Sequence, residues 1–190
     1  MYKLHTACRV CNSEKLTQHL DLGMMPLSNA LCNTPDEEPE RYPLKVLFCE
    51  NCSLSQLSIV IDPETLFGHY VYRSSISQGY KDHCHEMAIE LKEKYNLNEN
   101  SFHIDIAGND GALLHEFRKV INYYKCLNVD PAANMFEICE AKGIRMFNKF
   151  WGKEAAQHLI ATGWPKADLI TATNVFAHVD DVREFLEAAK

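Results

Sequence analysis

The stretch from Phe102 to Leu114, FHIDIAGNDGALL, constrains the fold more than any other part of the chain. The apolar run Phe102–Ile106 is typical of a buried β-strand, residues 107–111 break it, and apolar residues then return at helical spacing. This pattern predicts a strand, a tight glycine turn and a helix that starts near Asp110, whose carboxylate suits the positive end of a helix. Glycine in such a turn lets backbone N–H groups approach a ligand closely.

A second signal for a nucleotide-like ligand follows the next expected strand. The apolar stretch Cys126–Val129 ends at Asp130, nineteen residues after Gly111. A carboxylate at the tip of this strand is placed to accept hydrogen bonds from both hydroxyl groups of a ribose. Together, the glycine turn and Asp130 indicate a cofactor that contains a nucleoside.

Strands and helices alternate from residue 102 onward. We expect strands near 102–106, 125–129, 144–147 and 168–173, and helices near 110–120, 132–142, 153–161 and after Asp181. Repeated β–α units predict an α/β fold, in which a parallel sheet carries helices on both faces. Ligands would gather at the carboxyl ends of the strands, in the loops 107–111, 130–131, 148–151 and 174–178.

Two C-x-x-C motifs, Cys8–Cys11 and Cys49–Cys52, mark the N-terminal region. Each motif folds a turn that presents two thiolates to one ion, and two such turns complete the tetrahedron that Zn²⁺ prefers. Because four thiolates leave no open coordination position, this zinc would be structural and not catalytic. A redox C-x-x-C pair is the alternative, but it needs no second motif. Glycine and proline residues between the motifs favour a ribbon of short strands and loops that the metal stabilises.

The segment between the zinc motifs and the α/β region is rich in hydroxyl and aromatic side chains. We expect Tyr70 and Tyr72 to alternate on a short strand, and the alternative is that they line a pocket where two modules meet. Residues 77–95 then predict an amphipathic helix with Met87, Leu91 and Tyr95 on one face. Within the zinc module, the charged run 36–40 is typical of a solvated loop.

Composition excludes several classes of protein. The net charge of −7 argues against binding to a nucleic-acid backbone, because such proteins are usually basic. The sequence lacks a run of about 18 apolar residues that would span a membrane, and its first residues lack the apolar core of a signal peptide. We therefore expect a cytoplasmic protein with reduced thiols. The cysteines outside the zinc motifs then read as small buried apolar residues: Cys32, Cys84, Cys126 and Cys139.

The organisation that we expect has three parts. A zinc-binding module covers residues 1–66, a linker segment with a helix covers 67–100, and an α/β domain covers 101–190. The chain stops at Lys190 inside an expected helix and before any fifth strand, which would leave an open sheet edge. We therefore expect an incomplete parallel sheet that belongs to a longer protein.

These motifs occur in the same order in the nucleotide-sugar C-methyltransferases, which this sequence resembles over essentially all of its length. The shared stretches are the two zinc motifs and residues 22–29, 70–75, 105–111, 130–131 and 174–178. The resemblance implies a zinc module, a Rossmann-like S-adenosylmethionine-binding domain, and a C-terminal domain or partner chain that completes the nucleotide-sugar site. It also implies cofactor contacts from Asp105, Ala107, Gly108, Asn109, Asp110, Gly111, Asp130, Pro131 and Asn174.

The reaction that the resemblance implies is methyl transfer to carbon three of a dTDP-4-keto-6-deoxy sugar. A carbon beside a ketone becomes nucleophilic when a base removes a proton and the enolate is stabilised. His178 follows the fourth expected strand, and an imidazole titrates near neutrality, so we assign it a catalytic role; a surface or helix-capping role is the alternative. Tyr72, or in second place Tyr70, resembles the family's tyrosine near the reacting centre and would donate a hydrogen bond or transfer a proton.

Two departures from the family pattern bear on these expectations. The family turn reads Asp-Ile-Gly-Ser-Asn-Asp-Gly, whereas here Ala107 precedes Gly108, and an alanine narrows the approach to the cofactor or imposes a negative φ. Because the C-terminal part is missing, we expect little turnover by this chain alone. Two rival interpretations are a non-catalytic module that binds zinc and a partner, and a zinc-containing RNA methyltransferase.

Overall fold

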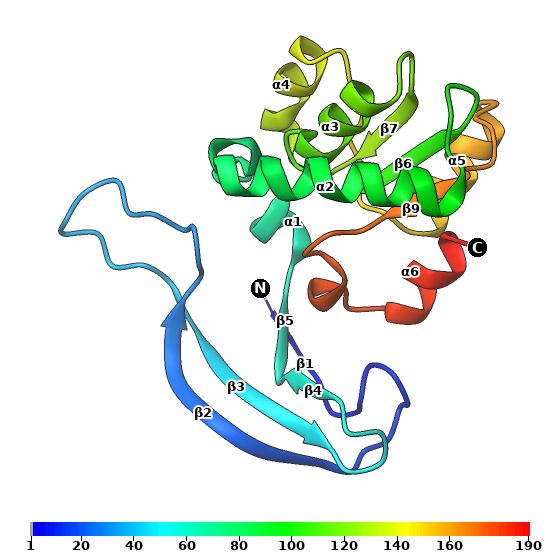
Figure 1. Cartoon of the computed structure of the whole chain (residues 1–190). Helices are drawn as coiled ribbons and strands as arrows, with labels where there is room; N and C mark the ends of the chain where they lie inside the picture. The colour runs from blue at the N-terminus through cyan, green and yellow to red at the C-terminus, as the bar shows by residue number, and fades with distance from the viewer. Residues whose placement is uncertain (1) are drawn as a thin grey trace. The chain divides into compact units, whose positions relative to one another are not determined.

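The computed structural model describes residues 2–190, which divide into two compact units (Figure 1). The first unit comprises the residues up to Phe67 together with Asp180–Arg183, and the second comprises Gly68–Val179 and Glu184–Lys190. Among these described residues, no helix is both long enough and apolar enough to cross a membrane.

The first unit is built on a curved hairpin of two long strands, β2 and β3 (Figure 1). Its elements are β1 (Tyr2–Leu4), β2 (Leu16–Pro26), β3 (Arg41–Cys49), β4 (Ser55–Leu57), β5 (Ile59–Ile61) and α1 (Pro63–Phe67). The expectation of only short strands is wrong for β2 and β3, because two shifts of register let the hairpin continue past irregular positions. The fully buried apolar cluster is small, with Tyr42, Ile59 and Ile61 at its centre. The charged run 36–40 lies in the exposed loop between β2 and β3.

The second unit contains a four-stranded parallel sheet with the order β8-β7-β6-β9. The strands are β6 (Phe102–Ile106), β7 (Lys125–Val129), β8 (Arg145–Phe147) and β9 (Leu169–Thr171). The sheet starts at β6, grows outward to β8 and then returns to the other side of β6 with β9. The loop after β6 therefore lies where the strand order reverses, which is the position of the ligand crevice in open α/β sheets. The predicted α/β fold is confirmed.

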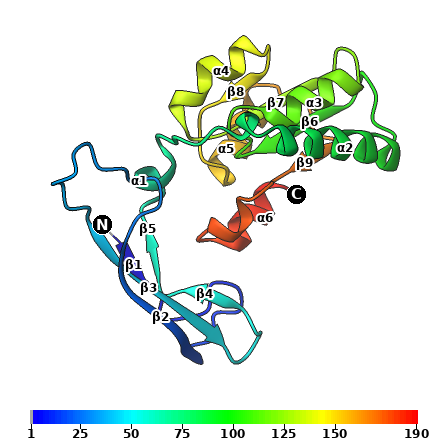
Figure 2. The ribbon, with the colours of Figure 1, turned by 60° about the vertical axis from the view of Figure 1, so that its left-hand side comes forward.

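Helices cover both faces of this sheet (Figure 2). The helical segments after Phe67 are η1 (Ser74–Ile76), α2 (Gln78–Tyr95), α3 (Ala112–Val120), η2 (Ala133–Met135), α4 (Phe136–Ala141), α5 (Lys153–Ala161), η3 (Phe176–His178) and α6 (Val182–Ala188). Phe102, Ile104 and Ile106 of β6 pack with Leu159 of α5 and Phe185 of α6 on one face. Residues of α2, α3 and α4 form the core on the other face, and α2 and α3 lie side by side (Figures 1 and 2).

The bounds of α2 follow from its local sequence. Ser77 caps the helix, since its hydroxyl accepts a hydrogen bond from the backbone N–H of Tyr80 at 3.3 Å. Met87 and Leu91 pack against the core as predicted, but Tyr95 is exposed, so its assignment to the apolar face is wrong. Likewise Cys84, Cys126 and Cys139 are buried as predicted, whereas Cys32 lies exposed in the loop of the hairpin.

Candidate functional site

The four cysteines of the C-x-x-C motifs come together in the first unit. Their Sγ atoms all lie within 4.8 Å of one another, with Cys8–Cys52 at 3.6 Å and Cys11–Cys49 at 3.5 Å. Cys8 and Cys49 are buried, and the second cysteine of each motif is more exposed. This is the donor set and the spacing that one tetrahedral zinc ion requires.

Both cysteine turns use the same backbone geometry. In the first turn, the Cys8 N–H donates to the Ser13 carbonyl and the Asn12 N–H donates to the Cys8 carbonyl, both at 2.9 Å. In the second, Cys49 and Ser53 repeat this pattern at 2.8 Å. Asn12 and Ser53 both adopt positive φ, at 59° and 63°, which closes each turn after its second cysteine. The turns therefore hold their thiols in place through backbone contacts.

The electrostatics of the cluster favour a bound cation. A hydrogen bond from the Asn51 side chain is the main cause that lowers the pKa of Cys11, to about 6. A backbone hydrogen bond from Leu54 lowers the pKa of Cys52, but the neighbouring thiols and desolvation raise it to about 12. Four close thiols cannot all ionise unless a positive ion compensates their charge. Zn²⁺ would supply that charge and be held by all four sulfur atoms.

The glycine turn after β6 is folded by hydrogen bonds to the end of β7. The Ala107 N–H donates to the Val129 carbonyl at 2.8 Å, and the Gly108 N–H donates to Asn128 Oδ1 at 3.1 Å. The Asn109 N–H donates to Asp130 Oδ2 at 2.8 Å. Hydrogen bonds thus join the turn to Asp130, the predicted ribose-binding carboxylate, at the carboxyl ends of the neighbouring strands β6 and β7.

Gly108 is required for internal packing. A Cβ at this position would lie 2.5 Å from Asp105 Oδ2 and 2.7 Å from Asn128 Oδ1, closer than real Cβ atoms come to such atoms. The sequence predicts a glycine here to leave room for a ligand beside the backbone. The structure gives a different reason, the close approach of Asp105 and Asn128. The space beside Gly108 is filled by the protein's own side chains.

Ala107 adopts a φ of 54°, so the expectation that alanine imposes a negative φ is wrong. The hydrogen bond from its N–H to Val129 holds the residue in the left-handed region despite its Cβ. Ala107→Gly should raise the free energy of unfolding by about 1 kcal/mol, because glycine adopts this conformation without strain. Chemical denaturation would measure the change. Ala156→Gly inside α5 is the matched control and should lower stability by a similar amount; equal signs for the two variants would contradict the account.

Three buried polar side chains, His103, Asp105 and Thr171, form a row of hydrogen bonds between β6 and β9 next to the turn. His103 Nε2 lies 2.7 Å from Thr171 Oγ1, whose hydroxyl donates to Asp105 Oδ1 at 2.6 Å. Since the hydroxyl proton is directed at the carboxyl group, Thr171 accepts its other hydrogen bond from the Nε2–H of His103. Burial lowers the pKa of His103 to about 3 and raises the pKa of Asp105 to about 7. His103 and Thr171 were not predicted as site residues, since their pairing across β6 and β9 has no local sequence signal.

Asp130 lies at the end of β7 as predicted and is 5% exposed. Its Oδ2 accepts the Asn109 N–H and its Oδ1 accepts the Ala132 N–H, each at 2.8 Å. Burial raises the pKa of Asp130, and these two hydrogen bonds counteract the rise. Each carboxylate oxygen keeps acceptor capacity for a further donor, so this side chain fits the two hydroxyl groups of a ribose.

Asp110 does not cap α3, which begins at Ala112 and has Gly111 as its N-cap residue. Its fully buried carboxylate lies 3.2 Å from Lys142 Nζ. The same Oδ2 accepts a short hydrogen bond from the Ser75 hydroxyl and a bond from the Ser75 N–H at 3.3 Å. The predicted contact with the positive end of the helix is therefore replaced by a contact with the segment that carries Tyr70 and Tyr72.

Tyr70 and Tyr72 lie in an irregular segment, so the expectation of a short strand is wrong. The Tyr70 backbone exchanges two hydrogen bonds with the Asn134 side chain, at 3.0 and 2.8 Å, in the way that a strand partner would. The Tyr72 carbonyl accepts from Asn109 Nδ2 at 3.0 Å, and the Tyr72 side chain is 50% exposed. The structure thus brings the tyrosine segment to the glycine turn through its backbone.

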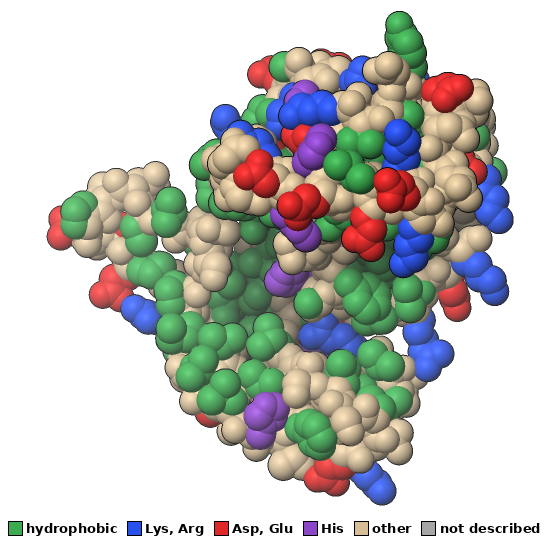
Figure 3. Space-filling model, in the orientation of Figure 1, with side chains coloured by type: hydrophobic (Ala, Val, Ile, Leu, Met, Phe, Trp, Pro, Cys, Tyr) green, Lys and Arg blue, Asp and Glu red, His purple; other side chains and the backbone are tan. Residues whose placement is uncertain are grey.

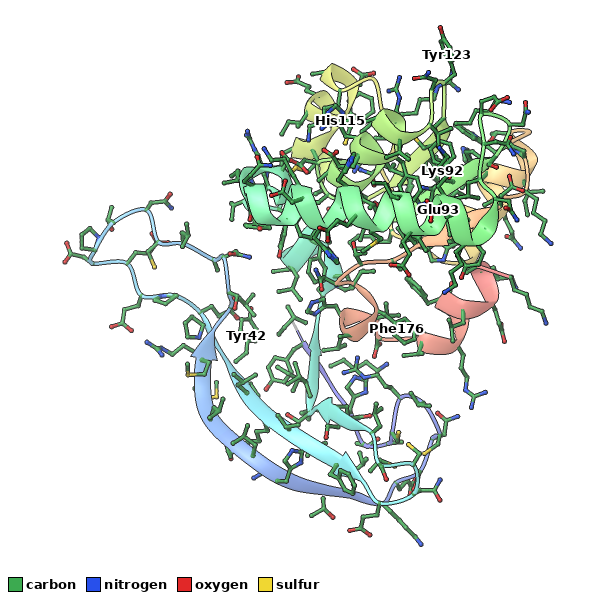
Figure 4. All side chains as sticks on the ribbon, in the orientation of Figure 1. Tyr42, Lys92, Glu93, His115, Tyr123 and Phe176 are labelled. Carbon is green, nitrogen blue, oxygen red and sulfur yellow. The ribbon has the colours of Figure 1, made fainter. Side chains whose placement is uncertain are left out.

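His178, Asn174 and Pro131 all lie at the carboxyl end of the sheet. His178 is the exposed last residue of η3, which follows β9, and β9 is the neighbour of β6. Phe176 of the same turn, labelled in Figure 4, packs on Phe185 with ring centroids 5.6 Å apart, which fixes η3 to the core. Asn174 adopts a φ of 56° in the connecting loop. Pro131 follows Asp130 directly and is half-buried.

Comparison with known proteins finds sequence matches that cover both units. A family model that describes a proposed zinc-binding domain matches residues 8–67. The chain is 29% identical over 181 residues to the C-methyltransferase NovU of Streptomyces niveus. The chain is related to the C-methyltransferases.

The match to NovU is long enough to include the second cysteine motif and the glycine turn. It covers 94% of this chain and 42% of the relative, so the chain spans less than half the length of this C-methyltransferase. The resemblance to C-methyltransferases drawn from the motifs is confirmed. The first unit is a zinc-binding module, and the second is a methyltransferase-related α/β unit.

Proposed function

We propose that the chain forms the zinc-binding and cofactor-binding part of an S-adenosylmethionine-dependent C-methyltransferase. The proposed acceptor is carbon three of a nucleotide-linked 4-keto-6-deoxy sugar, activated as its enolate. The observation that carries the proposal is the bonded unit of the glycine turn and Asp130 at the reversal point of the parallel sheet. The kinship with NovU, whose name specifies a C-methyltransferase, supports the reaction class.

The cofactor would be held by residues from two strand ends. Asp130 would accept the ribose hydroxyls, and residues 107–111 would surround the methionine part, with Pro131 and Asn174 in the flanking loops. Bound S-adenosylmethionine would supply an electrophilic methyl group on a sulfonium. The buried hydrogen bonds among Asp105, Thr171 and His103 would hold the ends of β6 and β9 in place beside the turn before a ligand binds.

The chain's own contribution to the acceptor chemistry lies in His178 and the tyrosine segment. His178 carries an imidazole at the carboxyl end of the sheet, at the end of η3, so we propose it as the base that removes the proton beside the ketone. The Tyr72 hydroxyl, or that of Tyr70, would donate a hydrogen bond to the enolate oxygen. We further propose that a domain or partner chain outside these 190 residues completes the sugar pocket, as the greater length of NovU suggests.

Charge on the helical surface favours a small acceptor over RNA. Figure 3 shows acidic, basic and histidine side chains interspersed over α2 on the visible face. The chain carries 26 acidic and 19 basic residues, whereas proteins that bind a phosphate backbone present clustered basic residues. A nucleotide sugar needs only local contacts, which this balance permits.

The ribose contact can be tested apart from the structural role of Asp130. Asp130→Asn should weaken S-adenosylhomocysteine binding by roughly tenfold or more, because a charge-assisted hydrogen bond contributes about 1.5–3 kcal/mol. Since the variant also disturbs two backbone hydrogen bonds, calorimetry should compare S-adenosylhomocysteine with its 2′,3′-dideoxy analogue in both proteins.

The wild type should discriminate strongly between the two ligands, and the variant should discriminate much less. Equal discrimination by both proteins would place the ribose elsewhere. A wild type that binds neither ligand would contradict the proposed function. The 190-residue chain would then be better described as a zinc-containing interaction module.

A further inference from the structure

The segment Gly68–Ser77, here called the tyrosine strap, is held over the cofactor turn by side chains of other elements. Asn134 brackets the Tyr70 backbone, and Asn109 Oδ1 accepts the Ser74 N–H at 3.0 Å while its Nδ2 donates to the Tyr72 carbonyl at 3.0 Å. The Ser75 N–H and hydroxyl donate to Asp110. The side chains of two consecutive turn residues, Asn109 and Asp110, therefore form hydrogen bonds with the backbone of the strap.

Asn109 also contacts Asp130, the residue that we propose binds the ribose. Its backbone N–H donates to Asp130 Oδ2 at 2.8 Å, so one residue joins Asp130 to Tyr72 and Ser74. Asn109 is 9% exposed and adopts a φ of 54°, a conformation that asparagine tolerates better than most residues. Its amide supplies one donor and one acceptor to the strap, and among side chains of this length only asparagine offers both.

Few apolar contacts hold the strap independently. Val71, Tyr72 and Ile76 expose 47%, 50% and 74% of their surface, so these side chains contribute little buried area. A segment with little buried apolar surface opens locally at low free-energy cost unless hydrogen bonds keep it closed. The order of the strap therefore depends on hydrogen bonds. Most of them come from the side chains of Asn109, Asp110 and Asn134, and the Gly68 carbonyl also accepts from the Ala133 N–H at 3.2 Å.

We propose that Asn109 is a positioning residue that couples cofactor binding at Asp130 to the placement of Tyr72. The proposal rests on the proposed function, because it takes Asp130 as the ribose ligand. A ligand that fixes Asp130 fixes the peptide of Asn109, and the amide of Asn109 then holds the Tyr72 carbonyl and the Ser74 N–H. Coupling of this kind is reciprocal, so an ordered strap also strengthens cofactor binding by the same factor. The tyrosine would thus reach its working position only when the methyl donor is bound.

The variant Asn109→Gly tests this coupling, because it removes the amide but keeps the backbone N–H and the positive φ. Hydrogen–deuterium exchange of the strap amides would be measured with and without saturating S-adenosylhomocysteine. In the wild type, we expect the ligand to slow exchange of the Ser74 amide at least fivefold. In Asn109→Gly, exchange without ligand should be about tenfold faster than in the wild type, and the ligand should no longer slow it.

Asn96→Gly is the matched control, since Asn96 also adopts positive φ but is an exposed residue at the end of α2. This control should keep the ligand response of the strap. Asn109→Asp is the second variant: it retains the acceptor for Ser74 but loses the donor to Tyr72, so the Ser74 amide should stay protected while ligand coupling falls.

The outcomes separate this inference from the proposed function. Ligand binding by the wild type with no change in strap exchange would overturn the coupling alone. Preserved ligand response in Asn109→Gly and Asn109→Asp would remove Asn109 from it. Failure of S-adenosylhomocysteine to bind the wild type would overturn the proposed function and the coupling together.

Discussion

Replacing Cys49 with serine is expected to unfold the first unit and leave the second folded. The Cys49 side chain is fully buried in the four-thiol cluster, and the unit has only a small apolar core around Tyr42, Ile59 and Ile61. Structural zinc contributes on the order of 10–16 kcal/mol to small zinc-dependent folds. A loss of this size exceeds the total stability of a typical domain, so the variant should lose the zinc and the hairpin together.

Two measurements separate the units. Both tryptophans, Trp151 and Trp164, belong to the second unit, so their fluorescence reports its unfolding. The unfolding temperature measured in this way should be the same in Cys49→Ser as in the wild type. Amide exchange across β2 and β3 should become fast, and elemental analysis should fall from about one zinc per chain towards none.

Cys32→Ser provides the matched control for the zinc experiment. Cys32 is exposed and is not one of the four clustered cysteines, so this variant should keep its zinc and its protected hairpin. A Cys49→Ser protein with a fully protected hairpin would show that the apolar core stabilises the module without the metal. Zinc absent from folded, reduced wild type would reject the metal site itself.

The elements that local sequence determines were predicted closely. The strands at 102–106 and 125–129 match β6 and β7 because short apolar runs between turn residues define buried parallel strands. The cysteine cluster was predicted for a similar reason, since the spacing inside each motif sets the geometry of each turn. In these cases one continuous stretch of chain holds nearly all the necessary information.

Features that depend on distant residues were predicted poorly. The tyrosine segment reads as a strand by alternation, but its partners are the side chains of Asn109 and Asn134 and not another strand. The buried pair of His103 and Thr171 depends on the register of β6 with β9, which no local pattern specifies. The bulges that lengthen the β2–β3 hairpin are likewise a property of two paired strands.

Gly108→Ala and Gly79→Ala make the same chemical change and should have opposite effects. Neither glycine requires positive φ, so alanine fits both backbones, and only the surroundings differ. At Gly79, near the start of α2, a new Cβ has no neighbour closer than 4.0 Å, and alanine favours the helix by about 0.5–1 kcal/mol. Gly79→Ala should therefore raise the unfolding temperature by a few degrees.

At Gly108 the added carbon would collide with side chains that cannot easily move. Asp105 is fixed by the Thr171 hydroxyl, and Asn128 is fixed by the Gly108 N–H and by a bond from its Nδ2 to the Asn109 carbonyl at 2.8 Å. Overpacking of this kind costs about 1–3 kcal/mol of stability. Here it would also displace the turn in which the Asn109 N–H donates to Asp130.

Thermal unfolding of Gly108→Ala, followed by tryptophan fluorescence, should show an unfolding temperature lower by about 10 °C. S-adenosylhomocysteine affinity should fall with it, whereas Gly79→Ala should bind normally. An unchanged unfolding temperature in Gly108→Ala would mean that Asp105 and Asn128 can yield, and that the turn does not depend on the close packing of β6 against β7.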